Sequence, residues 1–370
     1  MSKPDVYQQL RKHLDSLPVG FPSTKSGVEL RILRRLFSEE EAQMACQLRP
    51  FPETASEIAQ RIGRLPAQVE PLLERMAKKG LISRSRAGGK TIFAASWFII
   101  GIYEHQVATL TKDFAKDFEQ YVNEALRDEI ASVNTPQLRV IPVHTSITST
   151  MRVAPYEDAR QIIRAQSKIA VAECICKKEK ALLGHGCDKP REVCLTFSTA
   201  AYDYIENGLG REITQEEALE ILDRAEQAGL VMSPGNVQKN FAMCLCCGCC
   251  CALLSNLKKL PKPSTLVASN YYAQADPELC EGCETCLTRC QMNAITVHDG
   301  TAKVNLDYCI GCGLCTTTCP TGALTLVRKK ESKTLVPPAN VIELYMKIGK
   351  ERQERQSTDA HPHPRSKSVR

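Results

Sequence analysis

The sequence has no apolar stretch long enough to cross a bilayer. Its longest apolar run, around residues 97–103, is far shorter than a transmembrane helix. The first residues, MSKPDVYQQLRKHL, are polar and lack the apolar core of a secretory signal peptide. Together these absences predict a soluble protein located in the cytoplasm.

Motifs of nucleotide-dependent and hydrolytic enzymes are absent too. We find no phosphate-binding P-loop, no G-x-G-x-x-G after a strand-like run and no Ser-His-Asp arrangement. The sequence therefore predicts no catalytic residue and favours a carrier or a subunit over an enzyme that acts alone. The net charge of +6 is modest for 370 residues and does not by itself indicate a nucleic-acid-binding protein.

Cysteines are almost missing from the first half of the chain and abundant in the second. Residues 1–173 contain one, Cys46, and residues 174–319 contain the other eighteen. A chain of this length can form a large core without disulfides, and cytosolic cysteine clusters are more often metal ligands or redox groups. The cysteine usage therefore points to metal binding.

Two cysteine runs near the C-terminus share one spacing. Residues 280–290 read CEGCETCLTRC and residues 309–320 read CIGCGLCTTTCP, both with the pattern C-x2-C-x2-C-x3-C. The second copy follows the first by 29 residues, and each copy is followed by a strand-like segment, AITV or ALTLV. Three closely spaced thiolates can surround one side of a cubane cluster, and the shared glycine lets backbone amides approach its sulfurs.

This repeat closely resembles the bacterial two-cluster ferredoxin domain over roughly residues 271–328. The resemblance implies two [4Fe-4S] clusters, in which the fourth cysteine of each run binds the other cluster. The implied ligands are Cys280, Cys283, Cys286 and Cys319 for one cluster, and Cys309, Cys312, Cys315 and Cys290 for the other. One departure is Gln291, which stands where the second copy has Pro320 and is expected to loosen the turn. A zinc site is the disfavoured alternative.

Ten further cysteines precede the repeat and are candidate ligands for one or two more iron–sulfur clusters. They are Cys174, Cys176, Cys187, Cys194, Cys244, Cys246, Cys247, Cys249, Cys250 and Cys251. Because neighbouring residues point in different directions, the tract CLCCGCCC at residues 244–251 is expected to contribute ligands to more than one side, with Gly248 permitting a bend. The arrangement more loosely resembles long ferredoxin-type proteins of anaerobes. The alternatives are a zinc site at the first four cysteines and a redox dithiol in the tract.

Residues 38–96 follow the order helix, helix, short turn, helix and β-hairpin. Ser38 with Glu41 predicts a capping box, and Gly88-Gly89 predicts the hairpin turn. This order resembles the winged helix-turn-helix fold. The leading positions of its second helix include Glu70, so we expect at most weak nucleic-acid binding through basic residues on the wing, Arg84, Arg86 and Lys90. The alternative is a protein-docking module.

Two further segments suggest contacts with partners. Residues 97–132 read as one long helix, broken softly near Gly101, with an apolar stripe that fits either a homodimer interface or packing within the chain. Residues 331–370 read as a docking segment, NVIELYMKI, followed by a disordered basic tail. Packing of that segment on its own domain is the favoured alternative to docking.

The predicted fold class is α+β. The expected units are an N-terminal extension (1–37), a winged-helix-like domain (38–96), a long helix or linker (97–135), an α/β cysteine-rich module (136–267), a ferredoxin domain (268–330) and the C-terminal segment (331–370). The predicted function is transfer of single electrons between a donor and a partner redox enzyme. The alternatives are an iron–sulfur redox or oxygen sensor that regulates transcription, and an oxidoreductase subunit.

Overall fold

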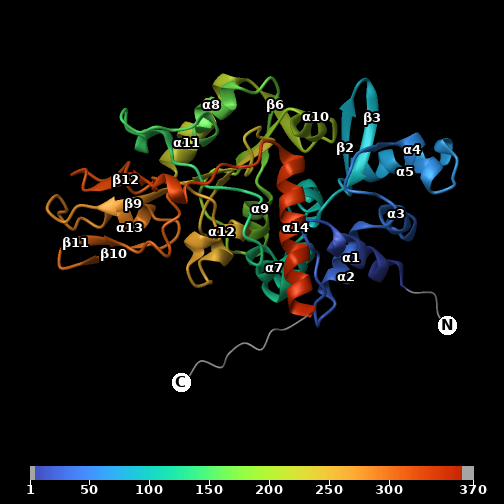
Figure 1. Ribbon diagram of the computed structural model, residues 1–370, viewed down its shortest axis with the longest axis horizontal. Helices are drawn as coiled ribbons and strands as arrows, with labels where there is room; N and C mark the ends of the chain where they lie inside the picture. The colour runs from blue at the N-terminus through green and yellow to red at the C-terminus, as the bar shows by residue number, and fades with distance from the viewer. Residues whose placement is uncertain (1–4, 361–370) are drawn as a thin grey trace.

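The structure is a computed structural model that describes residues 5–360. Helices and sheets are mixed, as predicted for the α+β class. The N-terminal helices and hairpin lie at one end, the ferredoxin-like strands lie at the other, and a five-stranded sheet lies between them (Figure 1). No helix in this part of the chain is long and apolar enough to span a membrane.

The N-terminal unit joins five helices to a small sheet of order β1-β3-β2. Its elements are α1 (Val6–Ser16), α2 (Val28–Leu36), α3 (Glu39–Ala45), β1 (Glu53–Thr54), α4 (Ala55–Arg61), α5 (Pro66–Lys78), β2 (Ile82–Ala87) and β3 (Lys90–Ala95). Helices α1 and α2 share one hydrophobic core with the rest of the unit. Residues 5–37 are therefore part of this unit.

The helix boundaries and the hairpin between residues 38 and 96 follow the predicted signals. The Ser38 hydroxyl accepts from the Glu41 N–H, the Glu41 carboxylate accepts from the Ser38 N–H, and Thr54 caps α4 in the same way. Gly88 and Gly89 form the hairpin turn with φ values of 56° and 75°. Two successive positive φ angles favour glycine at both positions.

The prediction of one long helix over residues 97–132 is wrong for its first half. Residues 98–102 form a wide turn (η1, Phe98–Ile102) with non-helical backbone at Ile99, Ile100 and Gly101, and η2 (Glu104–Gln106) is a single 3-10 turn. The helix begins only after Thr111, whose hydroxyl accepts from the Phe114 N–H at 3.3 Å. It then runs through α6 (Lys112–Tyr121), η3 (Val122–Leu126) and α7 (Arg127–Ala131).

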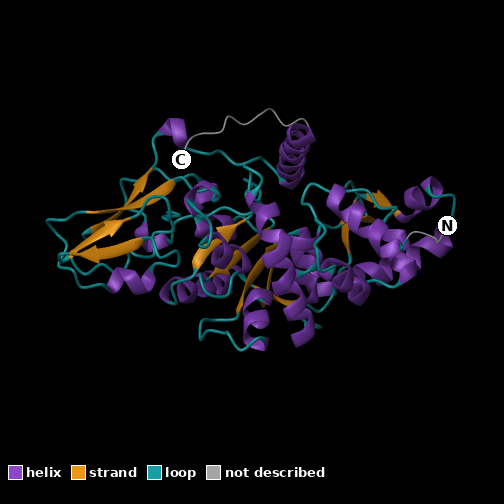
Figure 2. Cartoon of the chain, turned by 90° about the horizontal axis from the view of Figure 1, so that it is seen from below, coloured by secondary structure: helices purple, strands orange, loops and turns teal. Residues whose placement is uncertain are grey.

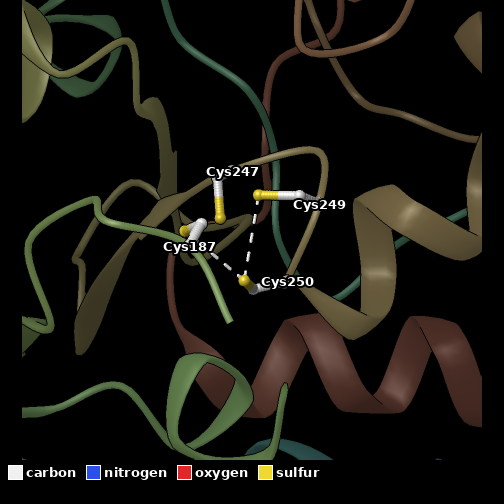
Figure 3. A group of neighbouring side chains, drawn as sticks. All are labelled: Cys187, Cys247, Cys249 and Cys250. Carbon is white, nitrogen blue, oxygen red and sulfur yellow. Dashed lines mark hydrogen bonds between the residues drawn. The ribbon is translucent and has the colours of Figure 1, made fainter. Parts of the chain in front are cut away.

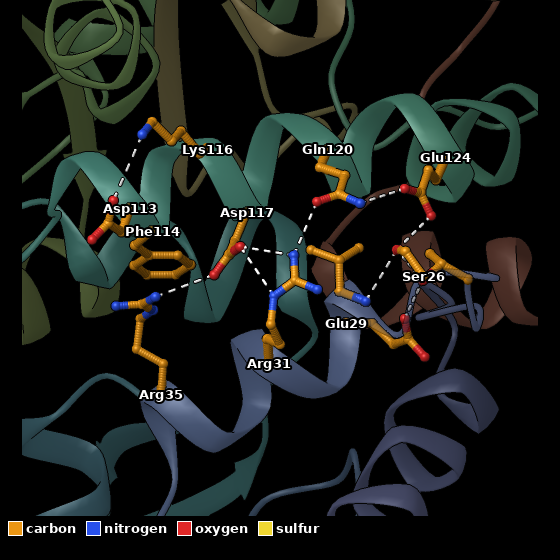
Figure 4. Close-up of polar contacts among 12 residues, drawn as sticks. Ser26, Glu29, Arg31, Arg35, Asp113, Phe114, Lys116, Asp117, Gln120 and Glu124 are labelled. Atoms are coloured by element: carbon orange, nitrogen blue, oxygen red, sulfur yellow. Dashed lines mark hydrogen bonds and ion pairs between the residues drawn. The ribbon is translucent and has the colours of Figure 1, made fainter.

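The apolar stripe of α6 is buried inside its own chain. Phe114, Phe118 and Tyr121 belong to the N-terminal core and are at most 2% exposed. Along the edge of this contact, Arg31 and Arg35 of α2 form ion pairs with Asp117 of α6 (Figure 4). This arrangement favours intramolecular packing over a homodimer interface formed by the same stripe.

The middle module is built on a sheet of order β6-β4-β5-β8-β7 (Figure 2). Its strands are β4 (Ile169–Glu173), β5 (Glu192–Phe197), β6 (Gly210–Ile213), β7 (Val231–Pro234) and β8 (Ala242–Cys246), and its helices are α8 (Ala159–Arg164), α9 (Ile175–Leu182), α10 (Thr199–Glu206), α11 (Gln215–Gln227) and α12 (Ala252–Leu257). Every strand pair is antiparallel. The expected α/β module is therefore an antiparallel α+β module.

The two faces of this sheet pack against different helices. Ile169 and Val171 of β4 face one side, in the same core as residues of α8 and α11. Ala170 and Ala172 face the other side, where they pack with Ala201 of α10. The second face also presents the cysteines of β5 and β8, described below.

The C-terminal unit contains two antiparallel strand pairs, β9 with β12 and β10 with β11. Its elements are β9 (Tyr271–Ala275), α13 (Thr285–Arg289), β10 (Ile295–His298), β11 (Thr301–Val304) and β12 (Leu324–Arg328); short 3-10 turns elsewhere are η4 (His144–Ser146), η5 (Pro155–Glu157), η6 (Pro263–Thr265) and η7 (Glu331–Lys333). Strands β10 and β12 lie where the two strand-like repeats were predicted.

The C-terminal segment folds back onto the chain as the helix α14 (Val341–Ala360), which contacts the end of α1 (Figure 1). Leu344 and Ile348 are buried, and the Tyr345 ring lies 3.7 Å from that of Trp97. The prediction that the docking segment packs on its own protein is confirmed. The predicted disorder is wrong for residues 351–360, because Arg352 pairs with Asp15 and Glu129; residues 361–370 lie outside the described part.

Candidate metal centres

The C-terminal unit has a cavity for each half of its cysteine repeat. One has a volume of about 360 Å³, part of it open to solvent, and its lining includes Cys290, Cys309, Cys312 and Cys315. The other has a volume of about 340 Å³, also partly open, and its lining includes Cys280, Cys283, Cys286 and Cys319. Each cavity thus combines three cysteines of one run with the fourth cysteine of the other run. This is the grouping that the ferredoxin resemblance implied.

Backbone amides point at the sulfurs of both cavities. The N–H groups of Ala273, Ala294 and Ala302 donate to the Sγ atoms of Cys309, Cys290 and Cys280 at 3.3, 3.1 and 3.3 Å, respectively. Such donors stabilise negative charge on sulfur, which a bound and reduced cluster increases. The donor set and the two cavities therefore fit two thiolate-bound clusters.

The two corresponding turns of the repeat need glycine for space as well as for conformation. Gly282 and Gly311 have φ values of 66° and 67°. A Cβ atom on Gly311 would lie 2.2 Å from the Tyr271 carbonyl oxygen, and one on Gly282 would lie 2.7 Å from the Gly300 carbonyl oxygen. No larger residue fits either turn without moving backbone.

Burial opposes ionisation of these thiols in the absence of metal. It raises the pKa of Cys312 to about 12 and also raises the pKa of Cys290. A metal that binds here must displace these protons, so cluster binding would contribute directly to folding.

Residues 279–333 match the family model of the 4Fe-4S dicluster domain. The C-terminal part of the chain is an iron–sulfur, ferredoxin-like domain. The match covers a minor part of the chain, and no curated protein matches the sequence. The N-terminal unit and the middle module are therefore interpreted from their own geometry.

The ten remaining candidate cysteines divide into two groups. The first, which we call the four-cysteine site, consists of Cys187, Cys247, Cys249 and Cys250, and their Sγ atoms all lie within 4.8 Å of one another (Figure 3). The Cys250 Sγ lies 3.5 Å from that of Cys187 and 3.8 Å from that of Cys249. Cys247 and Cys250 are buried, whereas Cys249 is exposed.

The four-cysteine site borders the ferredoxin-like domain. The backbone N–H of Gly248 donates to Oε1 of Gln291 at 2.8 Å, next to the cavity cysteine Cys290. A Cβ atom on Gly248 would lie only 1.9 Å from the Gln291 carbonyl oxygen. Glycine at residue 248 therefore allows the tract to contact the domain. The sequence had predicted only that this glycine permits a bend.

The second group, which we call the six-thiol group, contains Cys174, Cys176, Cys194, Cys244, Cys246 and Cys251. Five of them lie close enough for each thiol to shift the pKa of the next, in the order Cys174, Cys176, Cys251, Cys246 and Cys244. Cys194 joins them because it is the direct cross-strand partner of Cys244, which places both side chains on one face of the sheet.

Two helices begin at the six-thiol group. Cys174 is the N-cap of α9, and Cys251 is the N-cap of α12. The positive ends of both helix dipoles therefore lie at thiols of this group, which favours the thiolate form.

Charged side chains that the sequence analysis missed lie beside these thiols. Lys177 is buried and donates to the Leu245 carbonyl at 3.3 Å. Its charge opposes the rise in pKa that Cys176 and burial cause at Cys174, and it contributes to the lowered pKa of Cys247. Glu179 is buried too; its carboxylate accepts from the Tyr103 hydroxyl at 3.0 Å and raises the pKa of Cys176. The stretch KKEK reads as an exposed helix face, so nothing in the sequence signals these roles.

The structure separates residues that one alternative had combined. The zinc site considered at Cys174, Cys176, Cys187 and Cys194 is not formed, because Cys187 lies in the four-cysteine site and the other three in the six-thiol group. The tract at residues 244–251 was expected to contribute ligands in more than one direction, and its cysteines are indeed divided between the two groups. Cys46 packs in the N-terminal core, where burial raises its pKa to about 11.

Proposed function

We propose that this chain transfers single electrons between a donor and a partner redox protein through several iron–sulfur clusters. The observation that carries the proposal is the pair of four-cysteine cavities within the ferredoxin-like domain. A [4Fe-4S] cluster supplies a one-electron redox couple. The chain contributes the thiolate ligands, and its amide donors and the burial of the site adjust the reduction potential of the cluster.

The proposed ligands follow the lining of the two cavities. Cys280, Cys283, Cys286 and Cys319 bind the outer cluster, and Cys290, Cys309, Cys312 and Cys315 bind the inner one. Cys283 is exposed, which gives a partner close access to the outer site. The inner site faces the middle module, since the Val143 N–H donates to the Cys312 carbonyl at 3.0 Å.

The six-thiol group is the proposed site of at least one further cluster. Burial raises the pKa of Cys194, and the pKa of Cys244 rises to about 11 although the neighbouring Cys246 lowers it. Six buried or half-buried thiols, two of which are helix N-caps, suit a negatively charged centre that replaces their protons. The group lies between the N-terminal core and the sheet, where Cys176 packs against the former and Cys244 against the latter.

The winged-helix-like order of residues 38–96 supports a second candidate, an iron–sulfur regulator that binds DNA. The side-chain contacts of the hairpin argue against it. Arg84 of β2 bonds to Glu74, Glu206 and Asn207, and Arg86 pairs with Glu206 at 2.8 Å. The proposed role of this unit is therefore to cover the middle module rather than to bind DNA.

The full-length chain, purified without oxygen, tests the proposed function. We expect more than about eight iron atoms per chain with matching sulfide, and reduction by one-electron donors that is reversed on addition of an oxidised acceptor protein. Iron well below eight atoms, or clusters that cannot be reduced and reoxidised, would contradict electron transfer. Tight sequence-specific binding to DNA at physiological salt would instead favour the regulator.

A further inference from the structure

The sulfur positions of the four-cysteine site match a single tetrahedral ion. Zinc binds four thiolates at about 2.3 Å in a tetrahedron, which places the sulfurs about 3.8 Å apart. The two separations given above are 3.5 and 3.8 Å, and all four Sγ atoms lie within 4.8 Å of one another. The four side chains come from two separate loops, and their sulfur atoms gather in one place (Figure 3).

The other cysteine groups are more widely spaced. In residues 5–360, no other set of three or more Cys, His, Asp or Glu side chains brings its ligand atoms so close together. The two ferredoxin cavities and the six-thiol group thus differ from the four-cysteine site. The thiolates of a cubane bind four different irons at the corners of the cluster, so their sulfurs must lie farther apart than those around one ion.

We propose that Cys187, Cys247, Cys249 and Cys250 bind one zinc ion in a closed, four-thiolate structural site. All four positions are filled by protein sulfurs, which leaves no open position for catalysis. Zinc has no redox chemistry, so this site is separate from the proposed electron path. The sequence analysis had assigned the same cysteines to an additional iron–sulfur cluster.

The surroundings of the site suit its charge. Four thiolates and one zinc ion carry two net negative charges, and the buried cation Lys177 donates at 3.3 Å to the carbonyl of Leu245, two residues before Cys247. The Nζ atom of Lys258 lies 3.1 Å from the point that a Cβ on Gly248 would occupy. Two lysines thus lie near the site. Their positive charges would compensate the net negative charge of the zinc and its four thiolates in this partly buried place.

The proposed role of the ion is to fix the tract against the ferredoxin-like domain. Cys247 and Cys249 flank Gly248, whose N–H contacts Gln291 at 2.8 Å. Binding both flanking thiolates to one ion, together with Cys187 from a distant loop, would fix the backbone in the conformation that makes this contact. Zinc binding would then stabilise the junction between the middle module and the domain.

Metal analysis of the full-length chain tests the proposal. We expect about one zinc per chain, with a zinc X-ray absorption spectrum that shows four sulfur neighbours at about 2.3 Å. Cys187→Ser and Cys249→Ser should each lose that zinc and retain the iron content of the unaltered protein. Cys46→Ser is the matched control, because Cys46 lies in the N-terminal core away from both groups, and it should retain zinc and iron.

Each contrary outcome overturns a definite part of the proposal. Loss of about four irons in the Cys249 variant would show that the site binds a cluster, and loss of one iron would show that the single ion is not zinc. A protein without zinc whose Cys187 and Cys250 are joined in a disulfide would show a redox dithiol. Absorption spectroscopy on the unaltered protein decides the ion even if a variant fails to fold. None of these results bears on reduction of the ferredoxin clusters, so the proposed function is tested separately.

Discussion

The Gly248 N–H donates to Oε1 of Gln291 at 2.8 Å and so joins the cysteine tract to the ferredoxin-like domain. In the repeat, Gln291 stands where the second copy has Pro320. Proline carries no side-chain acceptor, so it could not make this contact. The sequence suggested that Gln291 would loosen a turn. In the structure this residue instead supplies a specific contact between two units.

We predict that Gly248→Ala weakens this junction. The new methyl group would lie 1.9 Å from the Gln291 carbonyl oxygen, so backbone must move, at a cost of about 1–3 kcal/mol in the free energy of unfolding. Denaturant unfolding measures the change. Gly349→Ala is the control, since its Cβ would meet only ordinary contacts at 3.6 Å or more and should leave stability unchanged or higher. Equal stability of both variants would contradict the predicted close approach.

We predict that the two cavities can be emptied one at a time. Cys283→Ser should remove about four irons from the outer cavity, and Cys312→Ser should remove about four from the inner one, because serine is a poor ligand for iron. Iron analysis and the electron paramagnetic resonance spectrum of the reduced protein report the loss. If either single variant removes all eight irons, the two sites do not assemble independently.

We predict that the six-thiol group binds iron without help from the four-cysteine site. Replacing Cys174 and Cys246 together with serine should lower the iron content by about one cluster and leave zinc and the ferredoxin signals unchanged. Replacing Cys247 and Cys250 together should instead remove zinc and leave iron unchanged. The reverse pattern in the two double variants would contradict the division into two groups.

Local signals predicted much of the fold, whereas contacts between distant residues could not be predicted. Ser38 and Thr54 mark the starts of helices because a capping box is a motif of only four consecutive residues. The cysteine spacing likewise marks the ferredoxin-like domain. Gly101 marks only a soft break, so residues 97–111 were read as helix although the backbone from Ile99 to Gly101 is not helical. Arg352 forms its ion pairs with Asp15 and Glu129, more than 200 residues earlier, so the part of α14 from residue 351 onward was read as a disordered tail.

The candidate site shows the same limit. Sequence reasoning anticipated that the tract serves more than one side, since adjacent residues cannot all face one centre. It could not predict that Cys187 joins Cys247, Cys249 and Cys250 while Cys194 faces Cys244, because this depends on the pairing of β5 with β8. The register of an antiparallel sheet assigns each side chain to a face, and it is fixed by tertiary packing.

We predict that Arg84 acts in stability rather than in DNA binding. Arg84→Ala would leave Glu74 and Asn207 without this partner and should cost about 1–3 kcal/mol in the free energy of unfolding, because the guanidinium is mostly buried. Lys90→Ala is the control at an exposed position of the same hairpin and should change stability by less than about 0.5 kcal/mol. Any DNA binding should be weak and fall steeply with salt. A loss of tight binding in the Arg84 variant, with stability unchanged, would reverse this assignment.

We predict a pH-dependent contact between the middle module and the ferredoxin-like domain. Glu157 is buried and accepts from Arg328 at 2.7 Å and from the Tyr271 hydroxyl at 3.1 Å. Burial raises the pKa of this carboxyl, but Arg328 and Asn270 outweigh burial and bring it below its ordinary value of 4.5. A depressed pKa means that the carboxylate stabilises the fold fully above pH 4.5. That stabilisation is lost as the pH falls through the folded-state value.

Glu157→Gln removes this charge with little change in shape. At pH 7 the variant should be less stable by about 1–3 kcal/mol, since hydrogen bonds to the charged group are lost and Arg328 keeps a partly buried charge without its partner. Hydrogen exchange of the amides in β9 and β12 measures the opening of this contact. The difference between the variant and the unaltered protein should shrink as the pH is lowered below 4.5, because protonation removes the same charge. A difference that stays constant down to that range would show that Glu157 acts through shape alone, and its ion pair with Arg328 would contribute nothing to the junction.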